Sequence, residues 1–134
     1  MNKYHNRKTE VDGILFDSIK EAEKYKELKL AMLDSSEDGV YSFRNQPKYE
    51  LQPGFSKDGQ KYRSIVYIAD FEVIYRNGKK EVIDVKGYKT DVWKIKAKLF
   101  DYKFPKLTLV IEWNRNGQNG AVWLNTKKSV KRFG

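Results

Sequence analysis

The stretch of sequence that decides the fold is residues 67–87, YIADFEVIYRNGKKEVIDVKG. Apolar residues dominate it on both sides of residues 76–78, Arg-Asn-Gly, which are typical of a tight turn. The pattern predicts a long strand over residues 62–75 and a second strand over residues 80–85. We therefore expect a β-hairpin at the centre of the fold.

The hairpin carries two aspartates and a lysine whose positions depend on strand geometry. Side chains alternate between the faces of a strand, so Asp84 and Lys86 share one face and Val85 points to the other. An acid and a lysine are costly to bury without a use, and the apolar neighbours disfavour the alternative, a solvent-facing pair on an edge strand. A two-residue turn would put Asp70 on the wrong face. A three-residue loop with Gly78 left-handed, or an equivalent bulge, places Asp70 opposite Asp84 at about 5 Å, and we predict this geometry.

Two carboxylates and a lysine around an open cation position suit the hydrolysis of phosphodiesters. A hard cation, Mg²⁺ or Mn²⁺, takes oxygen ligands, polarises the phosphate and lowers the pKa of a water molecule. Asp70 and Asp84 are therefore the predicted metal ligands. Lys86 would orient or deprotonate the attacking water or stabilise charge on the phosphate, and the sequence leaves these roles open.

The rest of the chain predicts a single mixed domain. Apolar residues at helical spacing predict helices over residues 18–33 and 90–104. Short apolar or alternating runs predict further strands over residues 9–16, 41–43, 48–51, 107–113 and 121–124. Residues 53–60 are predicted to form a loop. This order favours an α/β or α+β domain over residues 1–134, with a mixed central sheet flanked by helices and with basic tails at residues 1–8 and 127–134.

Composition narrows the chemistry. The chain has 27 Lys and Arg against 18 Asp and Glu, a net charge of +9. On charge alone, a nucleic acid partner and an ordinary basic surface are about equally favoured. It has no cysteine, and its one histidine is His5, so cysteine nucleophiles, zinc-thiolate sites and histidine-dependent catalysis are excluded. No long apolar run or signal segment occurs, so we expect a cytoplasmic protein without a membrane partner or a small-molecule cofactor.

Several blocks of the chain together resemble one nuclease superfamily. Asp70 followed after a hairpin by Asp84-Val85-Lys86 is similar to the PD-(D/E)XK signature of restriction-endonuclease-like nucleases, with Ala69 where the motif name has proline. The wider blocks resemble its small phage-encoded endonucleases over residues 13–110. These blocks are residues 18–21 (SIKE), 46–51 (QPKYEL), 67–71 (YIADF), 84–87 (DVKG) and 96–100 (KAKLF).

The resemblance implies a four-stranded mixed sheet flanked by helices and magnesium- or manganese-dependent endonuclease activity on DNA. It also implies that an acid on the first helix, Glu21, completes the metal site and the catalytic set. The alternative for Glu21 is that it only caps the helix together with Ser18. The small size favours structure-selective cleavage of junction or branched DNA, or weakly specific cleavage, by a homodimer, in the host cytoplasm if the protein is phage-encoded. The sequence does not separate a sequence-specific enzyme from a structure-specific one such as a junction resolvase.

Further residues are candidates for nucleic acid contact. Lys94 and Lys98 share a face of the second helix, Tyr88 and Lys89 follow the catalytic lysine, and Gln46 could touch the DNA backbone. The alternatives are a solvated helix face and a structural turn residue. The second functional hypothesis is a non-catalytic nucleic-acid-binding module with a nuclease-like fold, which has no need to keep three costly charges together. RNA cleavage, or a structural phage protein that binds no metal, stays open.

Overall fold

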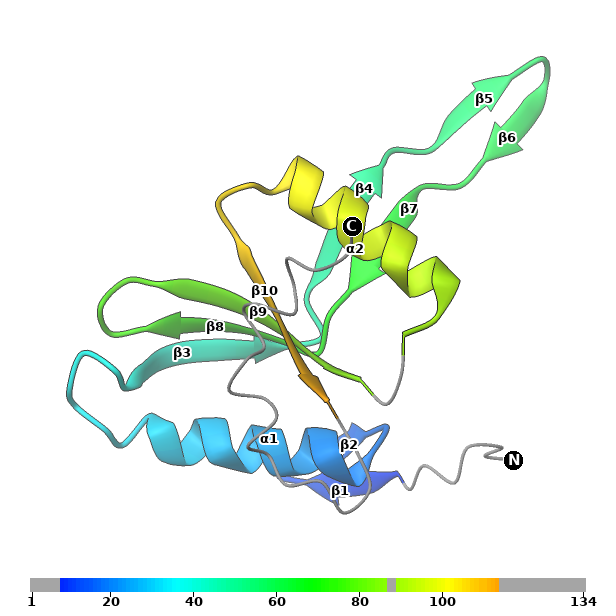
Figure 1. Ribbon diagram of the computed structural model, residues 1–134. Coiled ribbons are helices and arrows are strands. Elements are labelled where there is room, and N and C mark those ends of the chain that lie inside the picture. The colour runs from blue at the N-terminus through cyan, green and yellow to red at the C-terminus, as the bar shows by residue number, and fades with distance from the viewer. Residues whose placement is uncertain (1–7, 87–88, 114–134) are drawn as a thin grey trace. The chain divides into compact units, whose positions relative to one another are not determined.

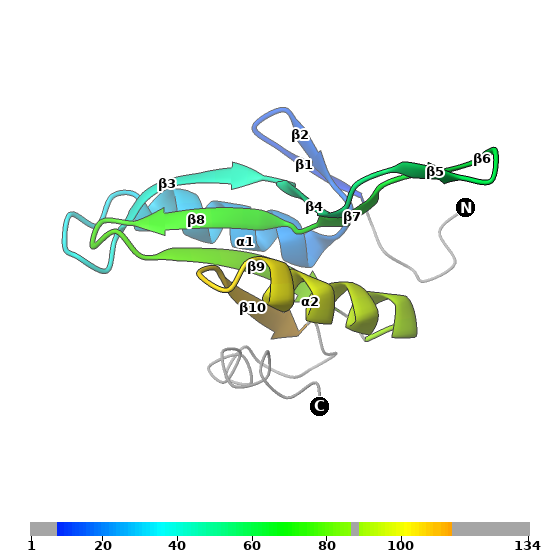
Figure 2. The ribbon, with the colours of Figure 1, turned by 90° about the horizontal axis from the view of Figure 1, so that it is seen from above.

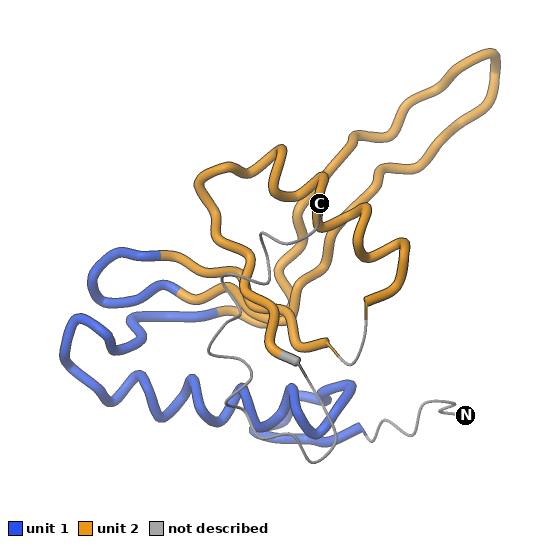
Figure 3. Tube along the Cα trace, viewed as in Figure 1, with its two compact units in different colours: residues 1–43, 74–79 blue, residues 44–73, 80–134 orange. Residues whose placement is uncertain are grey.

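The computed structural model describes residues 8–86 and 89–113. The chain divides into two compact units (Figure 3). One unit comprises the chain up to Phe43 together with Ile74–Lys79, and the other comprises Arg44–Val73 and the chain from Lys80 onward.

The first unit begins with a hairpin and a helix. β1 (Thr9–Val11) pairs with β2 (Ile14–Phe16) in an antiparallel ribbon. Asp12 and Gly13 join them at φ values of 52° and 79°, the left-handed backbone that a two-residue hairpin turn requires. α1 (Ile19–Ala31) follows, as the apolar spacing predicted.

The buried side of α1 packs on residues from both sides of it in sequence. Ala22, Tyr25 and Leu28, three residues apart, are buried, so they form one stripe along the helix. The Tyr25 ring lies 5.1 Å from that of Phe16 and 5.7 Å from that of Phe43, measured between centroids. This aromatic cluster is the core of the first unit.

A four-stranded mixed sheet has the order β10-β9-β8-β3 (Figure 1). Its strands are β3 (Val40–Asn45), β8 (Phe71–Tyr75), β9 (Lys80–Lys86) and β10 (Thr108–Trp113). β10 runs parallel to β9, with Ile111 beside Asp84. The expectation of an α+β fold with a mixed central sheet is confirmed.

Two smaller antiparallel ribbons belong to the second unit. β4 (Lys48–Gln52) pairs with β7 (Ile65–Ile68), and β5 (Phe55–Lys57) pairs with β6 (Gln60–Tyr62). Figures 1 and 2 show the second ribbon continuing outward from the first.

The helix α2 (Asp91–Lys103) covers the core of the second unit. The Thr90 side chain caps it by accepting a hydrogen bond from the Trp93 backbone at 3.0 Å. Phe100 is 0% exposed, and its ring packs against three others at centroid distances of 5.1–5.4 Å. The buried residues of this core are Tyr49, Leu51, Tyr67, Ala69, Val82, Trp93, Ala97, Phe100, Leu109 and Ile111.

Two expectations about the strands were wrong. Residues 53–60 are not a loop, because Asp58 and Gly59, at φ values of 52° and 78°, form the two-residue turn between β5 and β6. The long strand expected over residues 62–75 is interrupted at Arg63 and Ser64, between β6 and β7, and again at Ala69 and Asp70, between β7 and β8.

The strand expected over residues 121–124 lies outside the described residues, as do the expected tails apart from Lys8. Neither described helix has the length and hydropathy needed to span a bilayer.

Replacing Phe100 with alanine should destabilise the protein by about 3–5 kcal/mol, because it removes a fully buried ring and leaves a cavity among three others. Urea unfolding measures the change. Tyr102→Ala on the same helix is the control, because Tyr102 is 86% exposed and its loss should change stability by less than about 0.5 kcal/mol. Equal effects of the two substitutions would contradict this description of the core.

Candidate active site

The loop between β8 and β9 has the predicted three-residue geometry. The Tyr75 backbone N–H donates to the Lys79 carbonyl at 2.8 Å, which closes a loop of residues 76–78. Gly78 has a φ of 91° and donates to the Tyr75 carbonyl at 2.9 Å. The left-handed backbone at this position explains why glycine is needed there.

Asp70 lies where the chain passes from β7 to β8, and it is bonded to β9 twice. Its backbone N–H donates to the Ile83 carbonyl at 3.0 Å, one residue short of the Asp84 expected opposite it. Its carboxylate Oδ2 accepts a hydrogen bond from the Val85 backbone N–H at 2.6 Å. Asp70 therefore reaches the residue that separates Asp84 from Lys86, through a local irregularity of the ladder.

The interruption between β7 and β8 is hydrogen-bonded to the segment that joins β3 to β4. The Gln46 backbone N–H donates to the Asp70 carbonyl at 2.8 Å, and the Ala69 N–H donates to the Pro47 carbonyl at 3.1 Å. Gln46 has a φ of 49°, so the backbone departs from an extended conformation at Gln46, directly beside the interruption at Asp70. These main-chain bonds hold the Asp70 backbone in place.

Asp84 is 2% exposed and is held by three side chains that contact its Oδ2. The Tyr67 hydroxyl and the Trp93 indole N–H donate to it, the latter at 3.2 Å. The Lys86 ammonium lies 3.6 Å from the same oxygen, which confirms that Asp84 and Lys86 share a face. A buried carboxylate needs such hydrogen bonds and a counter-charge to be tolerated.

Tyr67 and Trp93 form a bridge between the sheet and α2. The Trp93 indole N–H also donates to the Tyr67 hydroxyl, at 3.0 Å. Burial raises the pKa of Tyr67 far above its usual value, and the charge and hydrogen bond of Asp84 raise it further. Its environment therefore favours the neutral form of Tyr67, whose hydroxyl donates to Asp84.

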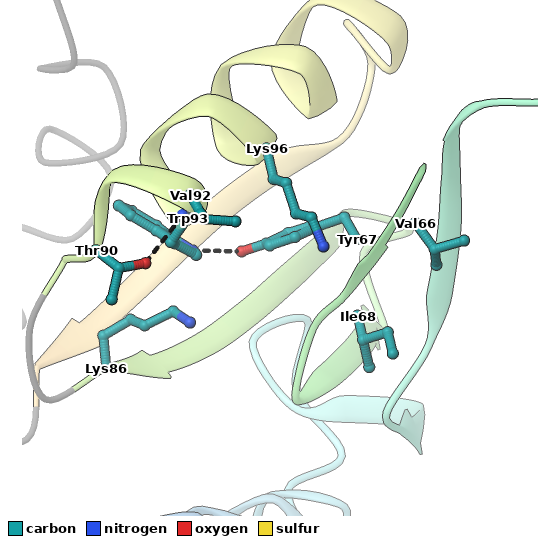
Figure 4. Close-up of a pocket in the computed structure, with 8 residues that line it drawn as sticks. All are labelled: Val66, Tyr67, Ile68, Lys86, Thr90, Val92, Trp93 and Lys96. Atoms are coloured by element: carbon teal, nitrogen blue, oxygen red, sulfur yellow. Dashed lines mark hydrogen bonds between the residues drawn. The ribbon is translucent and has the colours of Figure 1, made fainter. Parts of the chain in front are cut away.

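A pocket of about 240 Å³ opens beside this bridge (Figure 4). The ammonium groups of Lys86 and Lys96 point into the space between α2 and β7. The Lys86 ammonium also lies 5.5 Å from the centre of the Trp93 ring, within cation–π range. The residues that line the pocket are Val66, Tyr67, Ile68, Lys86, Thr90, Val92, Trp93 and Lys96.

The donor set suits a hard cation in part. Tyr67, Trp93 and Lys86 all contact Oδ2 of Asp84, so Oδ1 is available as a ligand within the described part of the chain. The carboxylate of Asp70 lies on the neighbouring residue Val85. Over residues 8–86 and 89–113, no three acidic or histidine side chains gather closely enough to form a metal-binding group. Asp70 and Asp84 are thus the residues that could hold Mg²⁺.

Glu21 belongs to the first unit, whereas Asp70 and Asp84 belong to the second. Its backbone N–H donates at 3.1 Å to the hydroxyl of Ser18, which is the N-cap of α1. Its side chain is 9% exposed. Ser18 therefore caps α1, while a capping role and a metal-binding role for the Glu21 side chain both stay predictions.

The other candidates for nucleic acid contact lie on varied surfaces. Lys94 and Lys98 are exposed on α2, and Lys94 lies 3.9 Å from the Asp91 carboxylate. The Lys89 ammonium is 6.0 Å from the centre of the Trp93 ring. Gln46 is exposed, and Tyr88 lies outside the described residues.

Comparison with known proteins places the chain in a family. Residues 1–116 match the family described as "Protein of unknown function (DUF1064)". The chain belongs to the DUF1064 family. No curated protein matches the sequence. Among solved structures, "Crystal structure of SSO0001" is similar at 16% identity and a TM-score of 0.39, over 87% of this chain and 70% of that one.

Sequence reasoning missed two residues of this DUF1064 site, Tyr67 and Lys96. Tyr67 precedes Asp70 by three residues, and the strand is interrupted between them, so side-chain alternation could not place Tyr67 beside Asp84. Lys96 follows Trp93 by three residues, which puts the two near one another on the helix. That spacing is a usable signal, because a tryptophan within an apolar helical stripe predicts a buried side chain.

Glu72, the second residue of β8, has a side chain that is 12% exposed. It accepts hydrogen bonds from Arg44 and from the Tyr49 hydroxyl, each at 2.8 Å. Burial alone would raise the pKa of Glu72, but these partners outweigh it and lower the pKa below its usual value. Glu72 is therefore engaged in a structural ion pair.

Replacing Tyr67 with phenylalanine should destabilise the DUF1064 chain by about 1–3 kcal/mol, because a buried carboxylate loses a hydrogen-bond donor. Chemical denaturation measures the change. Combining the substitution with Asp84→Asn should give less than the sum of the two effects, since both act on one bond. Tyr62→Phe, at an exposed tyrosine, is the control. Additive effects of Tyr67→Phe and Asp84→Asn would contradict the proposed coupling.

Proposed function

We propose that this DUF1064 protein is a metal-dependent endonuclease that hydrolyses DNA phosphodiesters. The observation that carries the proposal is the arrangement at the end of β9. There the Lys86 ammonium lies 3.6 Å from buried Asp84, and the Asp70 carboxylate is bonded to Val85 between them. The PD-(D/E)XK resemblance of the same residues supports the proposal independently of the coordinates.

Each residue has a role that follows from its contacts. Tyr67 and Trp93 hold Asp84 in one orientation, so that its second oxygen is presented without reorganisation. When bound at Asp70 and Asp84, a divalent cation supplies Lewis-acid chemistry that polarises a phosphate and eases deprotonation of water. The Lys86 ammonium stabilises the negative charge that develops on the phosphate, or orients the attacking water.

The pocket supports an anionic substrate. Lys86 and Lys96 direct two positive charges into it, and Thr90 supplies a hydroxyl on its wall. Phosphate groups are the natural ligands of such a set, and the net charge of +9 favours a polyanion over a small anion. We expect branched or junction DNA to be cut by a homodimer acting in the cytoplasm.

Wild-type protein should cleave DNA in the presence of magnesium, and Asp84→Ala, Asp70→Ala and Lys86→Ala should each reduce the rate more than ~100-fold, because each removes a charged group from the reacting centre. Supercoiled, linear and branched DNA are incubated with and without magnesium, and products are separated by electrophoresis. Lys103→Ala, at an exposed lysine at the end of α2, is the control and should cleave at the wild-type rate. Cleavage that survives Asp84→Ala would overturn the assignment.

Mn²⁺ or Mg²⁺ should raise the free energy of unfolding, by about 2.7 kcal/mol at a concentration one hundred times Kd, because only the folded chain brings the carboxylates together. Thermal unfolding with and without the metal measures this. Asp70→Asn combined with Asp84→Asn should abolish the shift, while Glu50→Asn, at an exposed acid of β4, should preserve it. An equal shift in both variants would place the cation elsewhere.

A non-catalytic nucleic-acid-binding module is the second candidate. It is favoured by the lack of a three-acid metal group among the described residues. It predicts DNA binding without cleavage under all metal conditions. The cleavage assay above therefore separates the two functions.

A further inference from the structure

The β5–β6 ribbon is a feature that the proposed active site does not use. Figures 1 and 2 both show it extending away from α2, β4 and β7, with no other described helix or strand of the second unit alongside it. Every residue of β5 and β6 is exposed. An isolated two-stranded ribbon is marginally stable in water, so its order here needs a local cause.

The ribbon has two such causes. Asp58 and Gly59 form its two-residue turn with the left-handed backbone that the turn requires. Phe55 lies opposite Tyr62, and their rings stack at 4.7 Å between centroids and 15° between planes. Such a cross-strand aromatic pair stabilises a ribbon by roughly 0.2–1 kcal/mol. The stacked pair therefore supports the pairing of β5 with β6.

The charge of the ribbon is positive. Residues 52–64 contain three basic side chains, Lys57, Lys61 and Arg63, and one acidic side chain, Asp58. All three basic residues are exposed, and within the described chain none of them forms an ion pair. Lys57 lies opposite Gln60 in the ribbon, and Lys61 lies opposite Ser56. Adjacent cross-strand pairs point to opposite faces of a ribbon, so the Lys57 and Lys61 side chains emerge from opposite faces.

We propose that the β5–β6 ribbon is a DNA-binding arm that contacts the phosphates of the duplex flanking the cleavage site. DNA is the inferred partner because its charge is complementary to that of the ribbon. Unpaired cations on both faces of a narrow ribbon can each contact one of the two phosphate backbones that border a groove. The major groove, about 12 Å wide, admits a two-stranded ribbon. The inference rests on the proposed DNA substrate but not on catalysis.

The connection of the arm to the active site sets its reach. β6 leads into β7, whose Tyr67 donates to Asp84. Gly59 at the tip precedes Tyr67 by eight residues, so at ~3.3 Å per residue the tip lies up to roughly 26 Å from the site. At ~3.4 Å per base pair this corresponds to about 8 base pairs of flanking duplex.

The test compares DNA affinity of two triple variants with equal loss of charge. Lys57→Gln, Lys61→Gln and Arg63→Gln together remove the arm's cations, and Lys26→Gln, Lys103→Gln and Lys106→Gln remove three exposed cations elsewhere. Fluorescence anisotropy with a labelled 30-base-pair duplex, in a chelator so that no cleavage occurs, gives Kd over a range of salt. Each lost phosphate contact lowers the slope of log K against log salt by about 0.9.

We expect the arm variant to lose at least ~10-fold in affinity and up to about 2.7 in salt slope, relative to the control variant. On duplexes extending fewer than about 8 base pairs from the site, the difference between the variants should vanish. Equal affinities of the two variants on the long duplex would overturn the proposal.

A second set of binding measurements distinguishes binding of duplex DNA from binding of single-stranded DNA. Phe55→Ser combined with Tyr62→Ser removes both rings, and a loss confined to single-stranded DNA would make the ribbon a base-stacking platform and overturn the duplex assignment. Far-UV circular dichroism checks that each variant is folded. If the wild type binds but never cleaves, the proposed function fails while the affinity comparison still decides the role of the arm.

Discussion

The interaction on which the rest of the second unit depends is the burial of the Asp84 carboxylate beneath α2. A carboxylate that is 2% exposed is unstable without compensation, and here two neutral donors and one ammonium supply it. Because Tyr67 comes from β7 and Trp93 from α2, the same bonds also tie these elements to β9. The requirement of the charge and the packing of the core are therefore satisfied by one set of side chains.

The second constraint is the interruption of the strand at Ala69 and Asp70, between β7 and β8. A continuous strand would hold Asp70 in the regular ladder, where its side chain would stand away from the neighbouring backbone. At the break, main-chain bonds to Pro47 and from Gln46 replace part of that ladder, and the Asp70 carboxylate bonds to the Val85 N–H. The irregularity brings an acidic oxygen to the residue between Asp84 and Lys86, which local strand regularity does not allow.

Charge is distributed over this unit in a way that agrees with its local geometry. Lys86 and Lys96 line a pocket beside the buried acid, whereas the cations of the β5–β6 ribbon stand fully in water. Lys86 and Lys96 are both partly buried, and Lys86 lies 3.6 Å from the Asp84 carboxylate, so this pair suits specific contact with one group. The second set is screened by salt and suits contact with an extended polyanion.

The sequence by itself determined both helices, the three-residue loop at Gly78 and the shared face of Asp84 and Lys86. These features depend on apolar spacing, capping residues and side-chain alternation, which act over a few neighbouring residues. It also contains the Asp58-Gly59 signal for the β5–β6 turn, but every residue of the flanking strands is exposed, so the alternation of apolar and polar residues that predicts a strand is weak there. Only the tertiary structure decided that Tyr67 and Trp93 hold Asp84 and that Asp70 bonds to Val85. It also decided that Lys96, rather than Lys94 or Lys98, lines the pocket. Those contacts join segments up to 26 residues apart, and their geometry is set by how helix and strands pack, which no local pattern specifies.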